Sequence, residues 1–180
     1  MGTTTHLMTA EELFWLPDDG LRHELIKGEL LTMSPSGAEH GELVVNLTVP
    51  LATYVKQNSL GVVFGAETGF KLETDPDTVL APDIAFVCRE RVSIIPSNYW
   101  AIAPDLVVEV ISPSEREMEV KQKTQQWLGF GVRLVWLVQP KSRTVEIHRV
   151  NKGQVLNVNE VLSGEEVVPG FEISVTNIFE

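Results

Sequence analysis

The sequence predicts an α/β protein in which helices flank a mixed central sheet. Two nearly continuous apolar runs, 106–111 (LVVEVI) and 133–138 (RLVWLV), lie on either side of a segment with helical periodicity. Such runs are typical of parallel central strands joined by a right-handed crossover. The other strand-like segments have the spacing of hairpins, whose strands run antiparallel, so we expect a sheet of mixed direction.

Three local patterns organise the first third of the chain. Thr9 and Glu12 have the spacing of a capping box, which predicts the start of a short helix. Lys27 and Gly28 form a turn signal inside an apolar segment, which predicts a hairpin. An amphipathic pattern then predicts a long helix that Pro50 should kink or break. These elements are expected at residues 9–16, 23–33 and 38–57.

The rest of the chain predicts further strands and one more helix. Ser114 and Glu117 repeat the capping pattern and predict a helix that runs to Leu128 and ends at Gly129 or Gly131. Further apolar segments predict strands, the last of them an edge strand. The strands are expected at residues 61–65, 69–73, 84–88, 106–111, 133–138, 144–150, 154–160 and 171–175.

Length and composition are those of an ordinary globular protein. The 180 residues are 43% hydrophobic and 22% charged, and no apolar run approaches the roughly 20 residues of a membrane helix. No linker or internal repeat is visible, so we expect residues 1–180 to form a single domain. The N-terminus lacks a secretory pattern and Cys88 is the single cysteine, so the cytoplasm is the expected compartment.

Charge is distributed unevenly along the chain. The net charge of −11 argues against tight nonspecific binding of nucleic acid, which depends on lysine and arginine. Residues 1–83 carry 4 basic and 13 acidic side chains, whereas residues 84–152 carry 10 basic and 7 acidic ones. Glu109 lies within this more basic part and Asp83 lies at its edge. A bound metal would neutralise some of the acidic side chains.

Glu109 is the most specific chemical signal in the sequence. It interrupts the apolar run 106–111, where a lone carboxylate costs several kcal/mol unless it is paired, protonated or metal-bound. An ion pair with an arginine, or a position at the end of the sheet, would also explain it. Asp83 opens another apolar run, and Lys123 lies beside the buried stripe of the predicted helix. Two carboxylates and a lysine directed at one point are the minimal set for a divalent metal and a phosphodiester.

Two Pro-Asp pairs compete for the role of the other carboxylate. Asp105 and Glu109 are four residues apart on one strand, so they would lie about 13 Å apart. They could not share an ion whose ligand oxygens lie about 2.1 Å away. Asp83 lies on a different strand and can face Glu109 if the two strands pair. We therefore assign Asp83 to the site and Asp105 to the start of a strand, although Pro-Asp before a strand is also a common turn.

Other polar residues have both a functional and a structural explanation. Lys123 itself could instead pair with Glu119 on its own helix. Lys121 is a supporting candidate on what looks like a more exposed face. Glu24 could support the site from the hairpin or form an ion pair within it. His40 could donate to the site or lie on the helix surface. Trp127 and Trp136 fit core packing better than base stacking.

The pattern formed by Asp83, Glu109 and Lys123 resembles the PD-(D/E)xK nuclease superfamily, which has the restriction endonuclease-like fold. More closely, the chain resembles a large and poorly characterised bacterial family of restriction endonuclease-like proteins. The resemblance covers roughly residues 9–150 and implies a restriction endonuclease-like core. The superfamily lysine would fall at Ile111, and here Lys123 on the following helix takes its place. The segments that carry the resemblance are HELIKGEL, APDIAFV, APDLVVEVISPSE and GVRLVWLVQP.

The resemblance implies metal-assisted hydrolysis of phosphodiester bonds in nucleic acid, with DNA as the expected substrate. Asp83, Glu109 and the carbonyl of Val110 would hold Mg²⁺ or Mn²⁺. Lys123 would orient or deprotonate the attacking water, or neutralise charge on the phosphate. The resemblance therefore implies a magnesium-dependent endodeoxyribonuclease, with a homodimer as one candidate assembly.

Two other functions fit the same sequence. A catalytically inactive binding or assembly module would explain the acidic composition, the displaced lysine and the absence of a separate DNA-recognition segment. A phosphodiesterase that acts on RNA or on a small nucleotide would use the same residues. Metal binding separates the inactive module from the two enzymes, and a panel of substrates separates the two enzymes.

Overall fold

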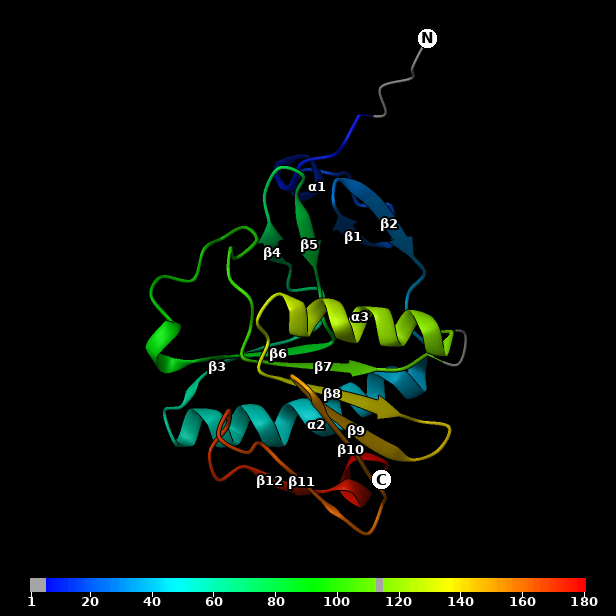
Figure 1. Ribbon diagram of the computed structural model, residues 1–180, viewed down its shortest axis with the longest axis vertical. Helices are drawn as coiled ribbons and strands as arrows, with labels where there is room; N and C mark the ends of the chain where they lie inside the picture. The colour runs from blue at the N-terminus through cyan, green and yellow to red at the C-terminus, as the bar shows by residue number, and fades with distance from the viewer. Residues whose placement is uncertain (1–5, 113–114) are drawn as a thin grey trace.

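The computed structural model describes residues 6–112 and 115–180. A mixed sheet lies at its centre, with α2 (Ala38–Gln57) on one face and α3 (Glu117–Gly129) on the other (Figure 1). The alternation of side chains along β7 (Leu106–Val110) explains this layering. Val108 packs in the cluster that covers α2, whereas Val107 packs against α3. The core therefore lies on both faces of the sheet.

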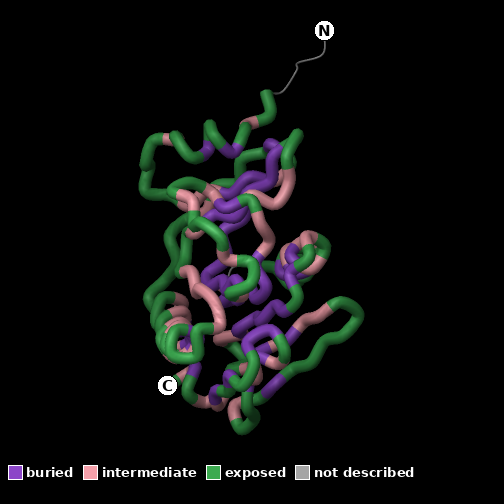
Figure 2. Tube along the Cα trace, turned by 90° about the vertical axis from the view of Figure 1, so that its left-hand side faces the viewer, coloured by how far each residue is buried: buried purple, intermediate pink, exposed green. Residues whose placement is uncertain are grey.

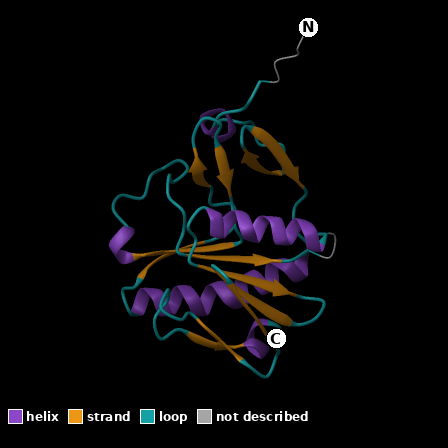
Figure 3. Cartoon of the chain, in the orientation of Figure 1, coloured by secondary structure: helices purple, strands orange, loops and turns teal. Residues whose placement is uncertain are grey.

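The central sheet has six strands within the described residues, in the order β10-β9-β8-β7-β6-β3 (Figure 3). β7 and β8 are parallel and α3 connects them, while the other neighbouring strands are antiparallel. The predicted mixed sheet with a strand-helix-strand crossover is therefore confirmed. Its remaining strands are β3 (Gly61–Phe64), β6 (Ile84–Cys88), β8 (Leu134–Gln139), β9 (Thr144–Arg149) and β10 (Lys152–Leu156).

The N-terminal strands form a second sheet, in the order β2-β1-β5-β4 among the described residues. This sheet stands above α3 in Figure 1, and α1 (Ala10–Phe14) packs beside it. The sequence patterns did not predict this separation. The segment around residue 173 does form a strand, but it pairs in a small third sheet. The strands concerned are β1 (Arg22–Ile26), β2 (Glu29–Met33), β4 (Phe70–Glu73), β5 (Thr78–Leu80), β11 (Val161–Ser163) and β12 (Glu172–Ser174).

Several local predictions are confirmed. Thr9 and Glu12 form the capping box, because each side chain accepts a hydrogen bond from the other's backbone N–H. Lys27 and Gly28 both have positive φ, at 50° and 80°, as a two-residue hairpin turn requires. The long helix α2 is confirmed, but the break that was one of the two effects expected of Pro50 does not occur, because α2 continues through that residue.

The start of α3 differs from the prediction. The helix begins at Glu117, and Glu119 accepts a hydrogen bond from the backbone N–H of Arg116 at 3.2 Å. The predicted cap, Ser114, lies outside the described residues. Two short 3₁₀ helices, Arg89–Arg91 and Val175–Ile178, complete the regular structure.

Buried residues fill the interior of the sheets and the inner faces of the helices (Figure 2). Trp127 and Trp136 are both fully buried, which confirms their predicted place in the core. Of the helices that the structure describes, none has the length and apolar composition to cross a membrane.

Candidate functional site

β6 and β7 bring Asp83 and Glu109 together. The two strands are antiparallel with Ile84 opposite Val108, so the residue before β6 lies beside Glu109. Asp83 is 2% exposed and Glu109 is 6% exposed. The Oδ2 atom of Asp83 accepts a hydrogen bond from the N–H of Val110 at 2.8 Å. Two buried carboxylates therefore share one end of the central sheet.

Asp105 lies elsewhere. It precedes β7, forms an ion pair with Arg91 at 2.9 Å and accepts a hydrogen bond from the N–H of Cys88 at 2.8 Å. These contacts tie the start of β7 to the end of β6. The structure thus separates the two Pro-Asp aspartates as the strand geometry predicts.

α3 supplies two donors to Glu109. Glu109 points to the α3 face of the sheet, as Val107 does. The Nζ atom of Lys123 lies 3.0 Å from Oε1 of Glu109, and Nε1 of Trp127 donates to the same oxygen at 2.9 Å. Lys123 and Trp127 are one helical turn apart, so both side chains reach the same face. The sequence analysis missed the indole donor, although its spacing from Lys123 was a usable signal.

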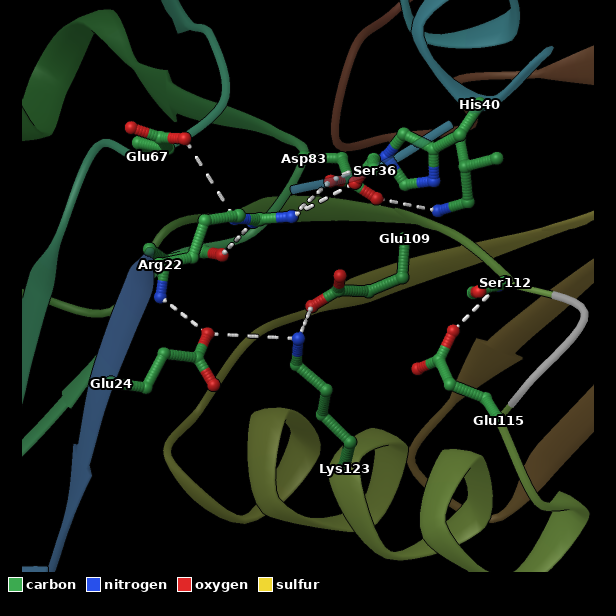
Figure 4. A network of polar contacts seen from close by, with 12 residues as sticks. Arg22, Glu24, Ser36, His40, Glu67, Asp83, Glu109, Ser112, Glu115 and Lys123 are labelled. Atoms are coloured by element: carbon green, nitrogen blue, oxygen red, sulfur yellow. Dashed lines mark hydrogen bonds and ion pairs between the residues drawn. The ribbon is translucent and has the colours of Figure 1, made fainter. Parts of the chain in front are cut away.

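The second sheet contributes a third buried carboxylate. Glu24 on β1 is 4% exposed, and its Oε1 atom accepts a hydrogen bond from the N–H of Ala81 at 2.9 Å. The Nζ atom of Lys123 lies 3.6 Å from the same oxygen. Lys123 therefore lies between Glu24 and Glu109, as Figure 4 shows.

Asp83 has two further neighbours on its other side. Nε2 of His40, at the start of α2, lies 3.0 Å from Oδ1 of Asp83. Nη1 of Arg22 on β1 lies 3.7 Å from the same oxygen (Figure 4). The sequence patterns did not identify Arg22 as a site residue. Arg22 and Glu24 are two residues apart on β1, so their side chains lie on the same face of the sheet. This spacing could have indicated Arg22.

Lys121 is not brought to these residues. It is exposed on α3 and lines a separate groove with Glu117 and Gln125. The sequence analysis gave Lys121 as a supporting candidate on what looked like a more exposed face. Side chains two residues apart on a helix point in different directions. Lys123 therefore reaches Glu109, whereas Lys121 points away from it.

Burial controls the charge of this cluster. Burial raises the pKa of Glu109 to about 7, and the nearby negative charges of Asp83 and Glu24 act in the same direction. Burial lowers the pKa of Lys123, but the attraction of Glu109 and Glu24 outweighs it, so the pKa lies above its usual value. Lys123 is therefore a stable ammonium, whereas Glu109 titrates near neutrality.

Asp83 and His40 stabilise each other as ions. Burial works to raise the pKa of Asp83, but the hydrogen bonds from His40 and from the N–H of Val110 outweigh it and hold the pKa below its usual value. The hydrogen bond to Asp83 raises the pKa of His40 more than burial lowers it. Asp83 is consequently a carboxylate over the whole neutral range.

The donor set fits a hard divalent cation. Three buried carboxylates face the ammonium of Lys123, the guanidinium of Arg22 and the imidazole of His40, and burial raises the pKa of Glu109. In the described part of the chain, no group of three His, Cys, Asp or Glu side chains has the arrangement of a metal cage. Mg²⁺ is usually held by one or two carboxylates with water and substrate oxygens completing its shell. Asp83 and Glu109 satisfy that description.

Comparisons with known proteins agree with this architecture. The family model Uma2, described as “Putative restriction endonuclease”, matches residues 10–176. A crystal structure titled as a “putative nuclease belonging to DUF820” from Anabaena variabilis ATCC 29413 matches with a TM-score of 0.80 and 21% identity. The match covers 96% of this chain and 97% of that chain. It shows a shared fold and confirms the predicted restriction endonuclease-like class. Among curated proteins, none matches the chain.

Proposed function

The chain belongs to the Uma2 family, and from this premise we propose that it is a metal-dependent nuclease that hydrolyses phosphodiester bonds in DNA. One observation supports the proposal above all others. Asp83 before β6, Glu109 on β7 and Lys123 on α3 meet at one point, where the ammonium lies 3.0 Å from the Glu109 carboxylate. A structural ion pair would not require the second carboxylate, nor the third that Glu24 provides.

Asp83 and Glu109 would hold Mg²⁺ or Mn²⁺, with the carbonyl of Val110 as a third ligand. In a strand the N–H and C=O of one residue point to the same side, and the N–H of Val110 points to Asp83. The carbonyl of Val110 therefore faces the same side of β7. When bound, the cation would polarise a phosphoryl oxygen and lower the pKa of a water molecule.

Lys123 would act as a fixed positive charge. Its raised pKa keeps the ammonium protonated, so it is suited to donate hydrogen bonds to a phosphate oxygen and to neutralise the charge that develops there. This assignment favours charge neutralisation over deprotonation of water. Glu24 and Glu109 hold the ammonium in place from two sides.

The remaining residues hold the carboxylates in position. His40 and the N–H of Val110 occupy one oxygen each of Asp83, and Trp127 fixes Oε1 of Glu109.

In the reaction, the oxygen of the attacking water bonds to phosphorus as the bond to the leaving sugar oxygen breaks. The proton of the water passes to solvent and a proton returns to the leaving oxygen. His40, Trp127 and the N–H of Val110 contribute by preorganisation, since they need not move when charge develops at the phosphate.

A substrate panel tests the proposal. Purified protein is incubated with Mn²⁺ or Mg²⁺ and with duplex DNA, single-stranded DNA and RNA of one sequence, in parallel with Glu109→Gln. We expect cleavage of DNA that needs the metal and disappears in Glu109→Gln, while a cooperative thermal unfolding transition shows that the variant is folded. Preferred cleavage of RNA would instead indicate the phosphodiesterase alternative, and no cleavage of any nucleic acid would contradict the proposal.

A further inference from the structure

The guanidinium of Arg22 is loosely held beside the candidate site. Its side chain is 17% exposed, and its contacts lie at 3.7 Å to Asp83, 4.0 Å to Glu67, 3.5 Å to the carbonyl of Ala81 and 3.4 Å to Oγ of Ser36. Well-formed charge-assisted hydrogen bonds are about 2.7–2.9 Å long. Arg22 is thus near four acceptors without a close bond to any of them.

A planar guanidinium in this state is suited to a phosphate. Arginine binds phosphate through two parallel N–H···O hydrogen bonds. None of the present contacts of Arg22 has this bidentate form. The position also fits, because Nη1 lies 3.7 Å from the carboxylate that would hold the metal. A phosphate at the site would therefore lie within reach of Arg22.

A cavity of about 230 Å³ adjoins Arg22. Its lining includes Arg22 and Glu24, together with Phe14 and Tyr99, whose rings are in edge-to-face contact with centroids 5.4 Å apart. The ring of Tyr99 lies directly on the backbone of Gly69, where a Cβ atom would clash with it. The cavity wall thus combines an aromatic ring packed on the backbone with the guanidinium that would bind the phosphate.

The charges on the cavity wall select what can enter. Asp18 and Asp19 also line it, and their carboxylates repel a second phosphate group. The Oδ1 atoms of these carboxylates contact Gly20, Leu21 and His23, whereas an Oδ2 atom can accept a hydrogen bond from an N–H group of a base. The wall therefore fits the uncharged base and sugar of a nucleotide, with its phosphate outside on Arg22.

We propose that Arg22 binds the phosphate that is cleaved and that this cavity receives the nucleoside attached to it, with the base against Tyr99. The inference rests on the proposed nuclease function and adds a substrate class to it. A base can enter the cavity only after it leaves the stack of a duplex. Single-stranded nucleic acid should therefore be the preferred substrate.

Binding of small probes tests the subsite without any catalysis. Thymidine 5′- and 3′-monophosphate, thymidine and inorganic phosphate are titrated by calorimetry, with and without Mn²⁺. We expect one of the two mononucleotides to bind about tenfold more tightly than phosphate or thymidine, since stacking on an aromatic ring contributes that much. Tyr99→Leu should reduce this affinity to that of phosphate, and Tyr99→Phe should retain it. Equal affinity for the mononucleotides and phosphate, or for wild type and Tyr99→Leu, would overturn the inference.

Cleavage kinetics provide the second arm. With single-stranded and duplex oligonucleotides of one sequence, we expect a lower KM for the single strand. Arg22→Gln should raise that KM about tenfold, Arg22→Lys should restore part of it, and the exposed control Lys56→Gln should change nothing. Equal cleavage of both forms with an unchanged KM in Arg22→Gln would overturn the inference and leave the nuclease function standing. Mononucleotide binding without any cleavage would contradict the nuclease function and leave the nucleotide-binding subsite standing.

Discussion

Lys123 on α3 lies 3.0 Å from Glu109 on β7, although the superfamily pattern places the lysine two residues after the glutamate on the same strand. Ile111 occupies that position, and it packs in the apolar cluster beneath α3 together with Val120 and Trp127. The strand position thus contributes to packing, and the helix above it returns an ammonium to the carboxylate. The lysine that contacts the Glu109 carboxylate thus comes from α3 instead of from the strand that carries the glutamate.

Removal of the ammonium should lower catalysis far more than metal binding. Lys123→Gln is expected to reduce kcat of metal-dependent cleavage by about 100-fold or more, because it removes a preorganised charge at the phosphate. Lys121→Gln changes the same charge on the exposed face of the same helix and should leave kcat within a factor of about two. Equal losses in the two variants would show that Lys123 acts only through the net charge of α3.

The indole of Trp127 should contribute more than its volume. Trp127→Phe removes the indole donor and leaves Oε1 of Glu109 with Lys123 as its remaining donor. Because hydrogen bonds to a buried charged group are costly to lose, the free energy of unfolding should fall by about 1–3 kcal/mol beyond the loss from the smaller ring. Trp136→Phe is a matched control, because Trp136 is equally buried and its Nε1 atom has no hydrogen-bond partner among the described residues. Chemical denaturation of both variants measures the difference. Equal destabilisation would contradict a role for the Trp127 hydrogen bond.

Metal affinity should rise with pH through neutrality. The pKa of Glu109 in the metal-free protein is about 7, and the cation needs the ionised carboxylate, so binding releases a proton. The apparent affinity for Mn²⁺ should increase by up to about tenfold per pH unit below 7 and level off above it. Calorimetry at pH 6, 7 and 8 checks this, and a flat profile would contradict the assignment of Glu109.

The stability of the metal-free protein should show the opposite trend. The folded pKa of Glu109 lies above its unfolded value, so the folded state binds the proton more tightly between the two values. The free energy of unfolding should therefore fall as pH rises from about 4.5 to about 7. Glu109→Gln removes this titration, and denaturation in the presence of a chelator should show a shallower decline. An identical slope in the variant would contradict the raised pKa.

Asp77 should anchor the N-terminal helix that lines the cavity. Its carboxylate accepts a hydrogen bond from the N–H of Ala10 at 2.7 Å and pairs with Nζ of Lys71 at 2.9 Å, and it is 8% exposed. Asp77→Asn should lower the free energy of unfolding by about 1–3 kcal/mol. Chemical denaturation measures this, and Asp75→Asn in the neighbouring exposed turn is the control. Equal stability of the two variants would contradict the anchor.

The sequence predicted those parts of the fold that local patterns determine. The apolar runs on either side of α3, the turn at Lys27 and Gly28 and the long helix α2 all follow from periodicity and turn chemistry. The second sheet was not predicted, because short strands such as β5 (Thr78–Leu80) do not encode their distant partners. β5 meets β1 through the single pair Leu25 and Val79.

The candidate site was predictable where a residue violated its surroundings. Glu109 is polar within an apolar run, and this conflict located the site. Arg22 and Trp127 were missed because an arginine in a hairpin and a tryptophan on a buried helix face agree with ordinary local rules. Their contacts depend on the packing of α3 and β1 over the central sheet. The single domain, the homodimer and the cytoplasmic location stay predictions.

Calorimetric titration with Mn²⁺ and Mg²⁺ tests the central claim most directly. The measurement compares wild type with the double variant Asp83→Asn, Glu109→Gln, after thermal unfolding has shown that both are folded. The account predicts that wild type binds the cation and that the double variant does not. Equal binding by both proteins, or no binding by wild type with or without DNA, would contradict it.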